Sequence, residues 1–232
     1  MHKLFFGVSS FMFLSSIVSV RAQDIPHRYY EQGKVGYRTT TSVVVNPVYE
    51  GGSEFKDGLA IVIRNGKRGC LDTKGKVAVP LVYDHLGQFY NGIAVALTKG
   101  SYGYINTSGQ TVIPFQFDQA FDFSEGAARI RMAGKYGFIT PGGKLLIAPE
   151  YSDACEFSEG LAAVEKNGKW GFVNQQNQVI IPFQYDKAYY YKNGIAAVGK
   201  GKERYFIDKK GVFVKNQYGG ENPNDLINTE KH

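Results

Sequence analysis

The sequence repeats itself with a fixed period, which the step from Phe55 to Phe89 defines. An aromatic side chain recurs at this spacing, at Phe55, Phe89, Phe123, Phe157 and Tyr191. A glycine follows each ring three residues later, at Gly58, Gly92, Gly126, Gly160 and Gly194. An alanine follows two residues after that, at Ala60, Ala94, Ala128, Ala162 and Ala196. A strict period without insertions indicates a repeat architecture, in which each unit buries its surfaces against its neighbours.

Helix-pair repeats can have the same period, about 34 residues, so helices have to be considered. Each unit here holds two or three glycine turn signals about ten residues apart. Helices do not tolerate glycine at that frequency, because each glycine costs about 1 kcal/mol relative to alanine. The runs between the turns are short and alternate in polarity, as strands do. The sequence therefore predicts an all-β chain.

Each unit is predicted to form three strands. In the first unit they are Leu59–Arg64, Arg68–Asp72 and Val77–Val79, and Pro80 ends the third. The pair Asn65-Gly66 is typical of a two-residue hairpin turn. The next turn carries a glycine in most units and an asparagine in the fourth, at Gly75, Gly109, Gly143, Asn177 and Gly211. Glycine and asparagine are the residues that most readily adopt a positive φ.

Hairpin geometry also assigns the two faces of the unit. A two-residue turn at Asn65-Gly66 places Val62 opposite Gly69 and Ala60 opposite Leu71. This face is apolar or small in every unit. The opposite face carries Arg68, Tyr102, Tyr136, Trp170 or Arg204 beside Cys70, Tyr104, Phe138, Phe172 or Phe206. A sheet that is apolar on both faces must be covered on both.

Two arrangements of the units satisfy this requirement. The favoured one is an open β-solenoid, an array of tandem three-stranded repeats. The alternative is a closed, five-bladed propeller-like ring, in which partial units at the two ends pair with each other. Propeller blades usually have four strands, which a unit of this length barely supplies.

The N-terminal residues have the layout of a secretory signal peptide. Lys3 precedes an uncharged stretch from Leu4 to Val20, and Val20-Arg21-Ala22 suits cleavage after Ala22. We therefore expect an exported protein, periplasmic or extracellular, with no membrane span once the leader is removed. The predicted organisation is a signal peptide (1–22), an N-terminal segment with a degenerate partial repeat (23–54), a repeat domain (55–214) and a flexible C-terminal tail (215–232). The units of the repeat domain start at 55, 89, 123, 157 and 191.

Composition narrows the range of partners. The formal net charge is +6 at pH 7, from 27 basic and 21 acidic residues. Removal of Lys3 and Arg21 with the leader leaves 25 against 21, a net charge of about +4. The basic residues are scattered without a run of five, so nucleic-acid binding is not expected.

The fourth unit carries a recognisable motif. Gly168-Lys169-Trp170-Gly171-Phe172-Val173 resembles the bacterial WG-repeat family. Tyr102-Gly103-Tyr104-Ile105 and Tyr136-Gly137-Phe138-Ile139 are similar, with tyrosine in place of tryptophan, and Gly33 to Tyr37 is similar to a degenerate copy. The resemblance covers about residues 33 to 214. It implies a β-rich repeat domain that is often exported, and it implies no catalytic residues.

Residues suited to metal binding or catalysis are sparse. The four histidines, at positions 2, 27, 85 and 232, include no pair with metal-ligand spacing, and His85 is expected at the surface. Cys70 and Cys155 lie two and a half units apart, too far for a disulfide in an open stack. We therefore predict two free thiols, no disulfide, no metal site and no cofactor.

Recurring acidic residues have two interpretations. Asp84, Asp118 and Asp186, with Asp153 slightly displaced, suggest either a repeated cation site or turn residues that bond to their own backbone, and the second is favoured. Glu125 and Glu159 have the appearance of a glycosidase pair, but they occupy equivalent positions of successive units. No catalytic residues are predicted, and an enzyme is the least supported class.

Three rings remain as candidate binding residues. Tyr102, Tyr136 and Trp170 lie at equivalent positions of three successive units. They could form an exposed ladder that stacks sugars or holds apolar side chains of a partner, or they could stack in the interior between units. The sequence thus favours an exported, non-catalytic repeat module that binds a protein or cell-envelope partner. The alternative is carbohydrate or cell-wall binding through the rings.

Overall fold

The protein is described here by a computed structural model of residues 24–214. The predicted signal peptide (1–22) and C-terminal tail (215–232) lie outside the described residues. The described part is built of β-strands and turns. It includes no helix that could cross a membrane.

Six antiparallel sheets follow one another along the chain, each a simple meander. The first contains β1 (His27–Glu31), β2 (Lys34–Arg38) and β3 (Val43–Tyr49). The second contains β4 (Gly51–Gly52), β5 (Leu59–Arg64), β6 (Lys67–Asp72) and β7 (Val77–Tyr83). The third contains β8 (His85–Leu86), β9 (Ile93–Thr98), β10 (Ser101–Asn106) and β11 (Thr111–Phe117). The fourth contains β12 (Gln119–Ser124), β13 (Ala127–Met132), β14 (Lys135–Ile139) and β15 (Leu145–Tyr151). The fifth contains β16 (Asp153–Ala154), β17 (Ala162–Lys166), β18 (Lys169–Val173) and β19 (Val179–Tyr185). The sixth contains β20 (Lys187–Ala188), β21 (Ile195–Lys200) and β22 (Glu203–Asp208).

The repeat unit has one more strand than the three predicted. An additional first strand precedes the predicted ones in each of the last five sheets. The sixth sheet lacks the third predicted strand, in whose place Phe213 forms an isolated bridge with Ile207. The additional strand has two residues in β4, β8, β16 and β20 and six in β12. A two-residue strand is too short to show an alternating pattern, so the sequence does not reveal it.

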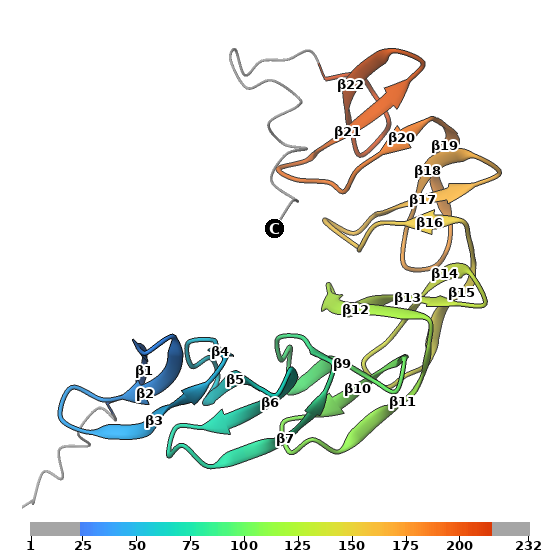
Figure 1. Ribbon diagram of the computed structural model, residues 1–232. Helices are drawn as coiled ribbons and strands as arrows, with labels where there is room; N and C mark the ends of the chain where they lie inside the picture. Colours follow the sequence, from blue (N-terminus) through green and yellow to red (C-terminus); the bar gives the residue numbers. More distant parts are fainter. Residues whose placement is uncertain (1–23, 215–232) are drawn as a thin grey trace, which may run out of the picture.

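The sheets form an open array. Figure 1 shows them along an arc whose first and last sheets lie apart, so the closed ring is not formed. In the sheets β4–β7 and β12–β15 of that view, the first strand lies toward the concave side of the arc and the last strand toward the convex side.

The predicted turns and register are confirmed. Val62 is opposite Gly69, and Ala60 is opposite Leu71. Asn65 and Gly66 have φ values of 52° and 70°, as a type I′ hairpin turn requires. Asn177, the exception among the turn glycines, has a φ of 60°. These turn residues therefore specify the pairing of the strands that they join.

The third predicted strand does not end at proline. In the second sheet β7 continues through Pro80 to Tyr83, with register shifts between its pairings with Arg68, Cys70 and Leu71. The strand tolerates Pro80 because it lies at the edge of its sheet, where a missing N–H group faces no neighbouring strand.

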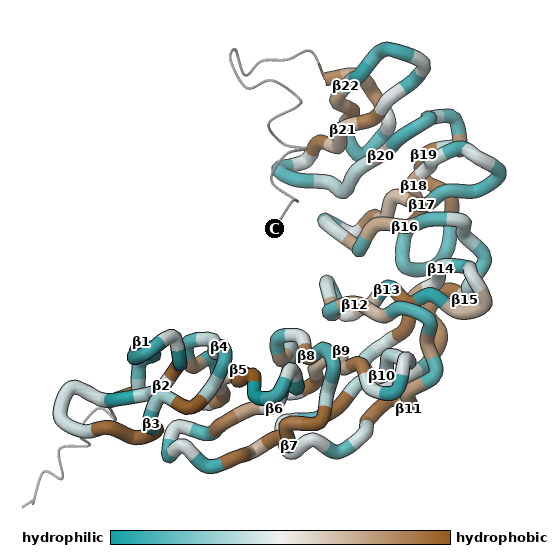
Figure 2. The backbone as a smooth tube through the Cα atoms, viewed as in Figure 1, coloured by the Kyte–Doolittle hydropathy of each residue, from teal (hydrophilic) through white to brown (hydrophobic). Residues whose placement is uncertain are grey.

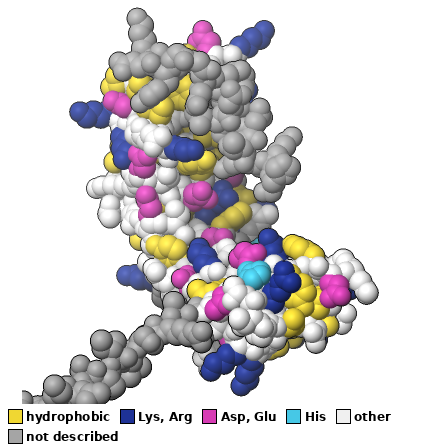
Figure 3. All heavy atoms as spheres, turned by 90° about the vertical axis from the view of Figure 1, so that its left-hand side faces the viewer, with side chains coloured by type: hydrophobic (Ala, Val, Ile, Leu, Met, Phe, Trp, Pro, Cys, Tyr) yellow, Lys and Arg dark blue, Asp and Glu magenta, His cyan; other side chains and the backbone are white. Residues whose placement is uncertain are grey.

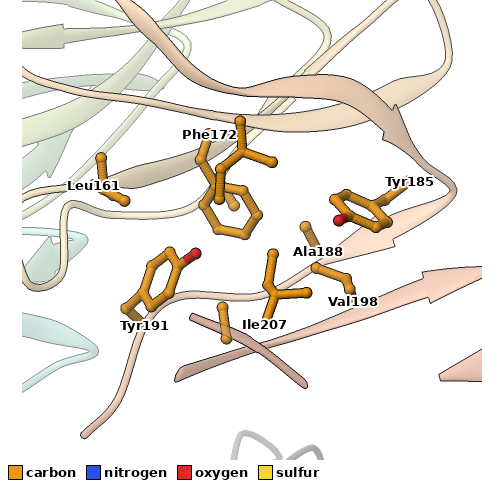
Figure 4. Packing of buried hydrophobic residues seen from close by; sticks show 10 residues of the cluster. Leu161, Phe172, Tyr185, Ala188, Tyr191, Val198 and Ile207 are labelled. Atoms are coloured by element: carbon orange, nitrogen blue, oxygen red, sulfur yellow. The ribbon is translucent and has the colours of Figure 1, made fainter. Parts of the chain in front are cut away.

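Hydrophobic clusters fill the space between successive sheets. The cluster between the fifth and sixth sheets combines Phe172 and Ile181 from one with Tyr191, Val198 and Ile207 from the other (Figure 4). Four further clusters occupy the other four interfaces. Figure 2 shows the apolar stretches in the strands and hydrophilic residues at many of the turns. Each unit therefore buries its faces against its neighbours, as the sequence predicts.

The repeated small residues permit this close packing. Ala162 is fully buried, in the cluster between the fourth and fifth sheets. A Cβ atom at Gly137 would lie 2.6 Å from the carbonyl oxygen of Ile147 and 2.7 Å from the nitrogen of Pro149. The outer strand of the sheet thus passes directly over the glycine of the motif.

The outward face of the first sheet is polar. His27 is paired with Arg38 there, in the place that Ala60 and Leu71 occupy in the second sheet. These two side chains and the loop of residues 39–43 line a shallow hollow of about 450 Å³. A polar outer face is what an end unit of a repeat array needs, because no further sheet covers it.

Replacement of Ala162 by Phe tests the packing between the sheets. Ala162→Phe should lower the free energy of unfolding by about 1–3 kcal/mol or more, because the buried site has no room for a ring. Glu165→Gln, three residues along the same strand and half-exposed, should change it little. Thermal melts of both variants measure the difference, and equal melting temperatures would contradict the assignment of the faces.

The glycine of the motif allows a second test. Gly137→Ala should cost about 1–3 kcal/mol, because the new methyl group meets backbone atoms that cannot rotate away. Gly142→Ala is the matched control, since its Cβ atom would lie 4.0 Å from the nearest neighbour, Thr140 Oγ1. Chemical denaturation gives both values, and an unchanged Gly137→Ala variant would refute the close approach.

Candidate functional site

One row of cross-strand partners in each repeat sheet carries residues that differ from unit to unit. We call this row the variable rung. It lies one pair away from the hairpin turn that joins the second and third strands. Its members are Gly51, Ile63 and Arg68 in the second sheet; His85, Leu97 and Tyr102 in the third; Gln119, Arg131 and Tyr136 in the fourth; Asp153, Glu165 and Trp170 in the fifth; and Lys187, Gly199 and Arg204 in the sixth.

Two positions that pack between the sheets are nearly constant. The alanine aligned with Ala162 is buried in all five repeat sheets, and the glycine of the motif recurs in four of them. By contrast, the first rung position is glycine, histidine, glutamine, aspartate or lysine, and every rung residue is at least partly exposed. Packing between sheets therefore restricts the buried alanine and glycine positions, which we call the frame, but allows the rung residues to vary in chemistry.

The three predicted rings belong to the rung and are half-buried. Tyr102, Tyr136 and Trp170 each pack against a different cluster between sheets. Tyr102 faces His85 with ring centroids 6.4 Å apart, and the Tyr136 hydroxyl donates to Gln119 Oε1 at 2.8 Å. No ring pair within residues 24–214 joins two of the three. They are separate anchors between sheets, each with part of its surface exposed.

Two arginines, which no sequence motif indicates, lie over the ring of Tyr136. Arg129 and Arg131 alternate along β13, so they project from the same face of the sheet. The guanidinium carbons lie 5.6 Å and 5.7 Å from the centroid of Tyr136. In the sequence, these two arginines occupy the positions that Ile61 and Ile63 have in the first unit, so they depart from the repeat.

His85 is half-buried beside Tyr102. Burial, followed by the charge of Arg68, lowers the pKa of His85 below its usual value. The imidazole is therefore neutral at pH 7 and contributes a polar but uncharged group to the rung of the third sheet.

The recurring aspartates interact with hairpin turns and lysines. Asp118 accepts a hydrogen bond from the N–H of Gly134 at 3.1 Å, and Asp186 accepts one from the N–H of Gly201 at 2.6 Å. Asp84 pairs with Lys67, and Asp153 bonds to the N–H of the next residue. Of the four, Asp153 bonds to the backbone next to it as expected. For Asp118 and Asp186 the expectation is wrong, because each bonds to a hairpin turn of the sheet that follows it and not to its own turn. No group of three or more residues suited to metal binding occurs in the described part of the chain.

Glu125 and Glu159 connect successive units. The carboxylate of Glu125 accepts from the backbone N–H groups of Glu159 and Gly160 at 2.6 Å and 2.8 Å. Glu159 accepts in turn from the N–H of Gly194 at 3.0 Å and pairs with Lys209. The bond from Gly194, followed by Lys209, lowers the pKa of Glu159. These oxygens hold the turns of the next unit in place.

The cysteines differ in accessibility. Neither Cys70 nor Cys155 forms a disulfide in the described structure, and Cys70 is fully buried. Burial raises the pKa of the Cys70 thiol to about 12, so this side chain is an unreactive part of the core at neutral pH.

Comparisons with known proteins identify the repeat. The family model "WG containing repeat" matches residues 39–67, 69–100, 102–136, 136–170 and 170–203. No curated protein matches the sequence.

Solved structures match the shape with low sequence identity. A crystal structure of the eukaryotic initiation factor is 17% identical, with a TM-score of 0.54, and the match covers 85% of this chain and 64% of that one. Kluyveromyces lactis Hsv2p is 9% identical with a TM-score of 0.47, over 87% of this chain and 75% of that one. The first likeness shows a shared fold alone. The chain spans less than two thirds of the initiation factor.

The carboxylate bonds between units predict acid sensitivity. The folded state lowers the pKa of Glu159, so its stabilising effect is present above the unfolded value of about 4.3 and is lost as the pH falls through the folded value. Glu159→Gln should therefore melt below the wild type at pH 7, and the gap should narrow between about pH 5 and pH 3. The exposed Glu156→Gln is the control. A gap of the same size at pH 7 and pH 3 would contradict the charge-dependent role.

Proposed function

Because the chain belongs to the WG containing repeat family, we propose that it is an exported, non-catalytic module that binds a protein partner of the cell envelope through its variable rungs. The observation that carries this proposal is the contrast between a nearly constant packed frame and partly exposed rungs that change chemistry in every unit.

The geometry of the rungs suits an extended partner surface. Successive sheets each present one rung, so the rungs follow the arc of the array. Repeat proteins use such extended surfaces for recognition. The half-buried rings supply apolar anchors, and tyrosine, tryptophan and arginine are the residues most often found at binding hot spots.

The charge distribution supports a protein partner over nucleic acid. Acidic and basic side chains are interspersed on the face shown in Figure 3. The rungs likewise combine acids in the fifth sheet with bases in the sixth. A mixed pattern suits complementary side chains of a protein, whereas a polyphosphate chain favours one continuous basic surface.

Export rests on the leader-like residues 1–22. The role as a binding module rests on the uniform units, since their constant length provides no inserted loops in which unique catalytic groups could gather. Both features are compatible with a module of the periplasm or the cell surface.

Site-specific photo-crosslinking tests the proposal. A photoreactive phenylalanine analogue would replace Leu97 or Lys187 of the rungs, or the exposed Gln116 or Gln184 of the outer strands as matched controls. We expect adducts with an envelope protein from the rung positions only, and an exported chain that starts at residue 23 by mass spectrometry. Equal crosslinking at all four positions, or none, would contradict a rung-based protein partner.

The carbohydrate alternative has its own readout. If the rings bind sugars, the wild type should be retained on peptidoglycan or glycan supports, and Trp170→Ala should lose retention while it stays folded, with a lower melting temperature because Trp170 packs against a cluster between sheets. That result, without protein adducts, would favour the alternative.

A further inference from the structure

The fourth sheet carries a pair of arginines that no other sheet has. At the position of Arg129 the other repeat sheets have Ile61, Val95, Ala163 and Ala197. At the position of Arg131 they have Ile63, Leu97, Glu165 and Gly199. Apolar or small residues thus satisfy the packing at the first position, so the frame does not require a charge there.

Neither arginine has an acidic partner. None of the five ion pairs within residues 24–214 includes Arg129 or Arg131. Arg129 donates from Nη1 to the carbonyl oxygen of Ala154. The nearby Asp118 carboxylate accepts from the N–H of Gly134. Two positive charges therefore lie side by side with no carboxylate of the described residues within the 4 Å of an ion pair.

Both guanidinium groups also have unsatisfied donors. Their Nε atoms are the buried side-chain nitrogens or oxygens of the described residues that lack any hydrogen-bond partner. An unpaired buried donor is costly, and in native structures such groups call for a specific explanation. Packing between the sheets does not explain this cost, because apolar or small residues fill the position of Arg129 in the other repeat sheets.

Aromatic rings hold the pair in place. The guanidinium carbon of Arg129 lies 3.8 Å from the centroid of Phe121, and both arginines also lie over the ring of Tyr136. Tyr136 is itself fixed by Gln119. Gln119 and Phe121 belong to β12, the first strand that is six residues long here and two residues long in the other repeat sheets. Stacking on rings orients a guanidinium group. Arg129 Nη1 is engaged by Ala154, whereas Arg131 is part exposed and makes no side-chain hydrogen bond within residues 24–214, so its terminal nitrogens are available to a ligand.

We propose that Arg129 and Arg131 form the docking site for an acidic segment of the protein partner, with Arg131 as the principal contact. This inference rests on the proposed function and names the chemistry of the partner. Side chains on one side of an extended segment are about 6.6 Å apart, the same spacing as that between two alternate residues of β13. A Glu-X-Glu segment would therefore place its carboxylates opposite the two guanidinium groups, which bind carboxylates with good geometry.

A peptide-binding experiment with the full chain tests this site. The probe is a fluorescein-labelled peptide of alternating glutamate and glycine, and the same peptide with glutamine is its uncharged counterpart. We expect fluorescence anisotropy to show at least about tenfold tighter binding of the glutamate peptide, and Arg131→Gln to weaken that binding about tenfold. Arg131→Lys should recover only part of it, because lysine keeps the charge but loses the planar fork.

Arg64→Gln is the matched control. Arg64 also stacks on a tyrosine, with its guanidinium carbon 4.7 Å from the centroid of Tyr49, and its loss removes the same charge from a different sheet. Equal weakening by Arg64→Gln and Arg131→Gln, or no preference for glutamate, would overturn the proposal. Displacement of the glutamate peptide by inorganic phosphate, at a phosphate concentration equal to that of the peptide's carboxylates, would also overturn the proposal. The site would then bind any oxyanion.

The outcome is separable from that of the proposed function. The crosslinking positions 97 and 187 lie in the third and sixth sheets, away from the arginine pair. Envelope adducts at those positions together with no glutamate preference would refute the acidic docking site alone. Melting temperatures of the arginine variants verify that each variant is folded.

Discussion

Burial of two apolar faces per sheet is the constraint on which the rest of this structure depends. A ring-bearing face, with Phe172 and Ile181 in the fifth sheet, covers the small-residue face of the next sheet, with Ala196 and Val198. The same arrangement recurs at all five interfaces. Because the two faces differ, the sheets stack in one direction only. The array therefore has two unlike ends, and its first sheet presents His27 and Arg38 where inner sheets present apolar residues.

Polar bonds between units reinforce this stacking. Hydroxyl groups of Ser124 and Ser158 donate to the carbonyl oxygens of Phe157 and Tyr191, one unit further along. The Glu125 carboxylate accepts hydrogen bonds from the turn of the following unit. A polar side chain that recurs from unit to unit in a repeat protein therefore indicates a bond between units. Residues that depart from the repeat are the better indication of a partner-binding site.

The variable rungs and the arginine pair are such departures from the repeat. The rungs lie at the margins of the sheet interfaces, so their rings are partly anchored in the core and partly exposed. Arg129 and Arg131 are charged, and neither forms an ion pair with a carboxylate of the described residues. A stacked array places stability and recognition on different residues. Buried residues stabilise the fold, whereas the exposed margins of the sheets can differ between units.

The local structure was determined by the sequence. Asn65-Gly66 admits one hairpin register, and that register alone places Val62, Ala60 and Leu71 on a common face. The positive φ of Asn177 and of the turn glycines follows from the few residue types that adopt it. Alternation then specified two apolar faces and hence the stacking of units.

The tertiary structure decided the features that depend on contacts between residues far apart in the chain. The two-residue first strands form only because the second strand of a preformed sheet offers them an edge. Pro80 remains in a strand because it lies at the opposite, unpaired edge of its sheet. The bond from Gly194 to Glu159 joins two successive units, and the stacking of Arg129 and Arg131 on Tyr136 joins two strands. Whether the sheets form an open array or a closed ring depends on the angle between successive sheets. That angle results from the packing of many residues at each interface, so no single residue determines it.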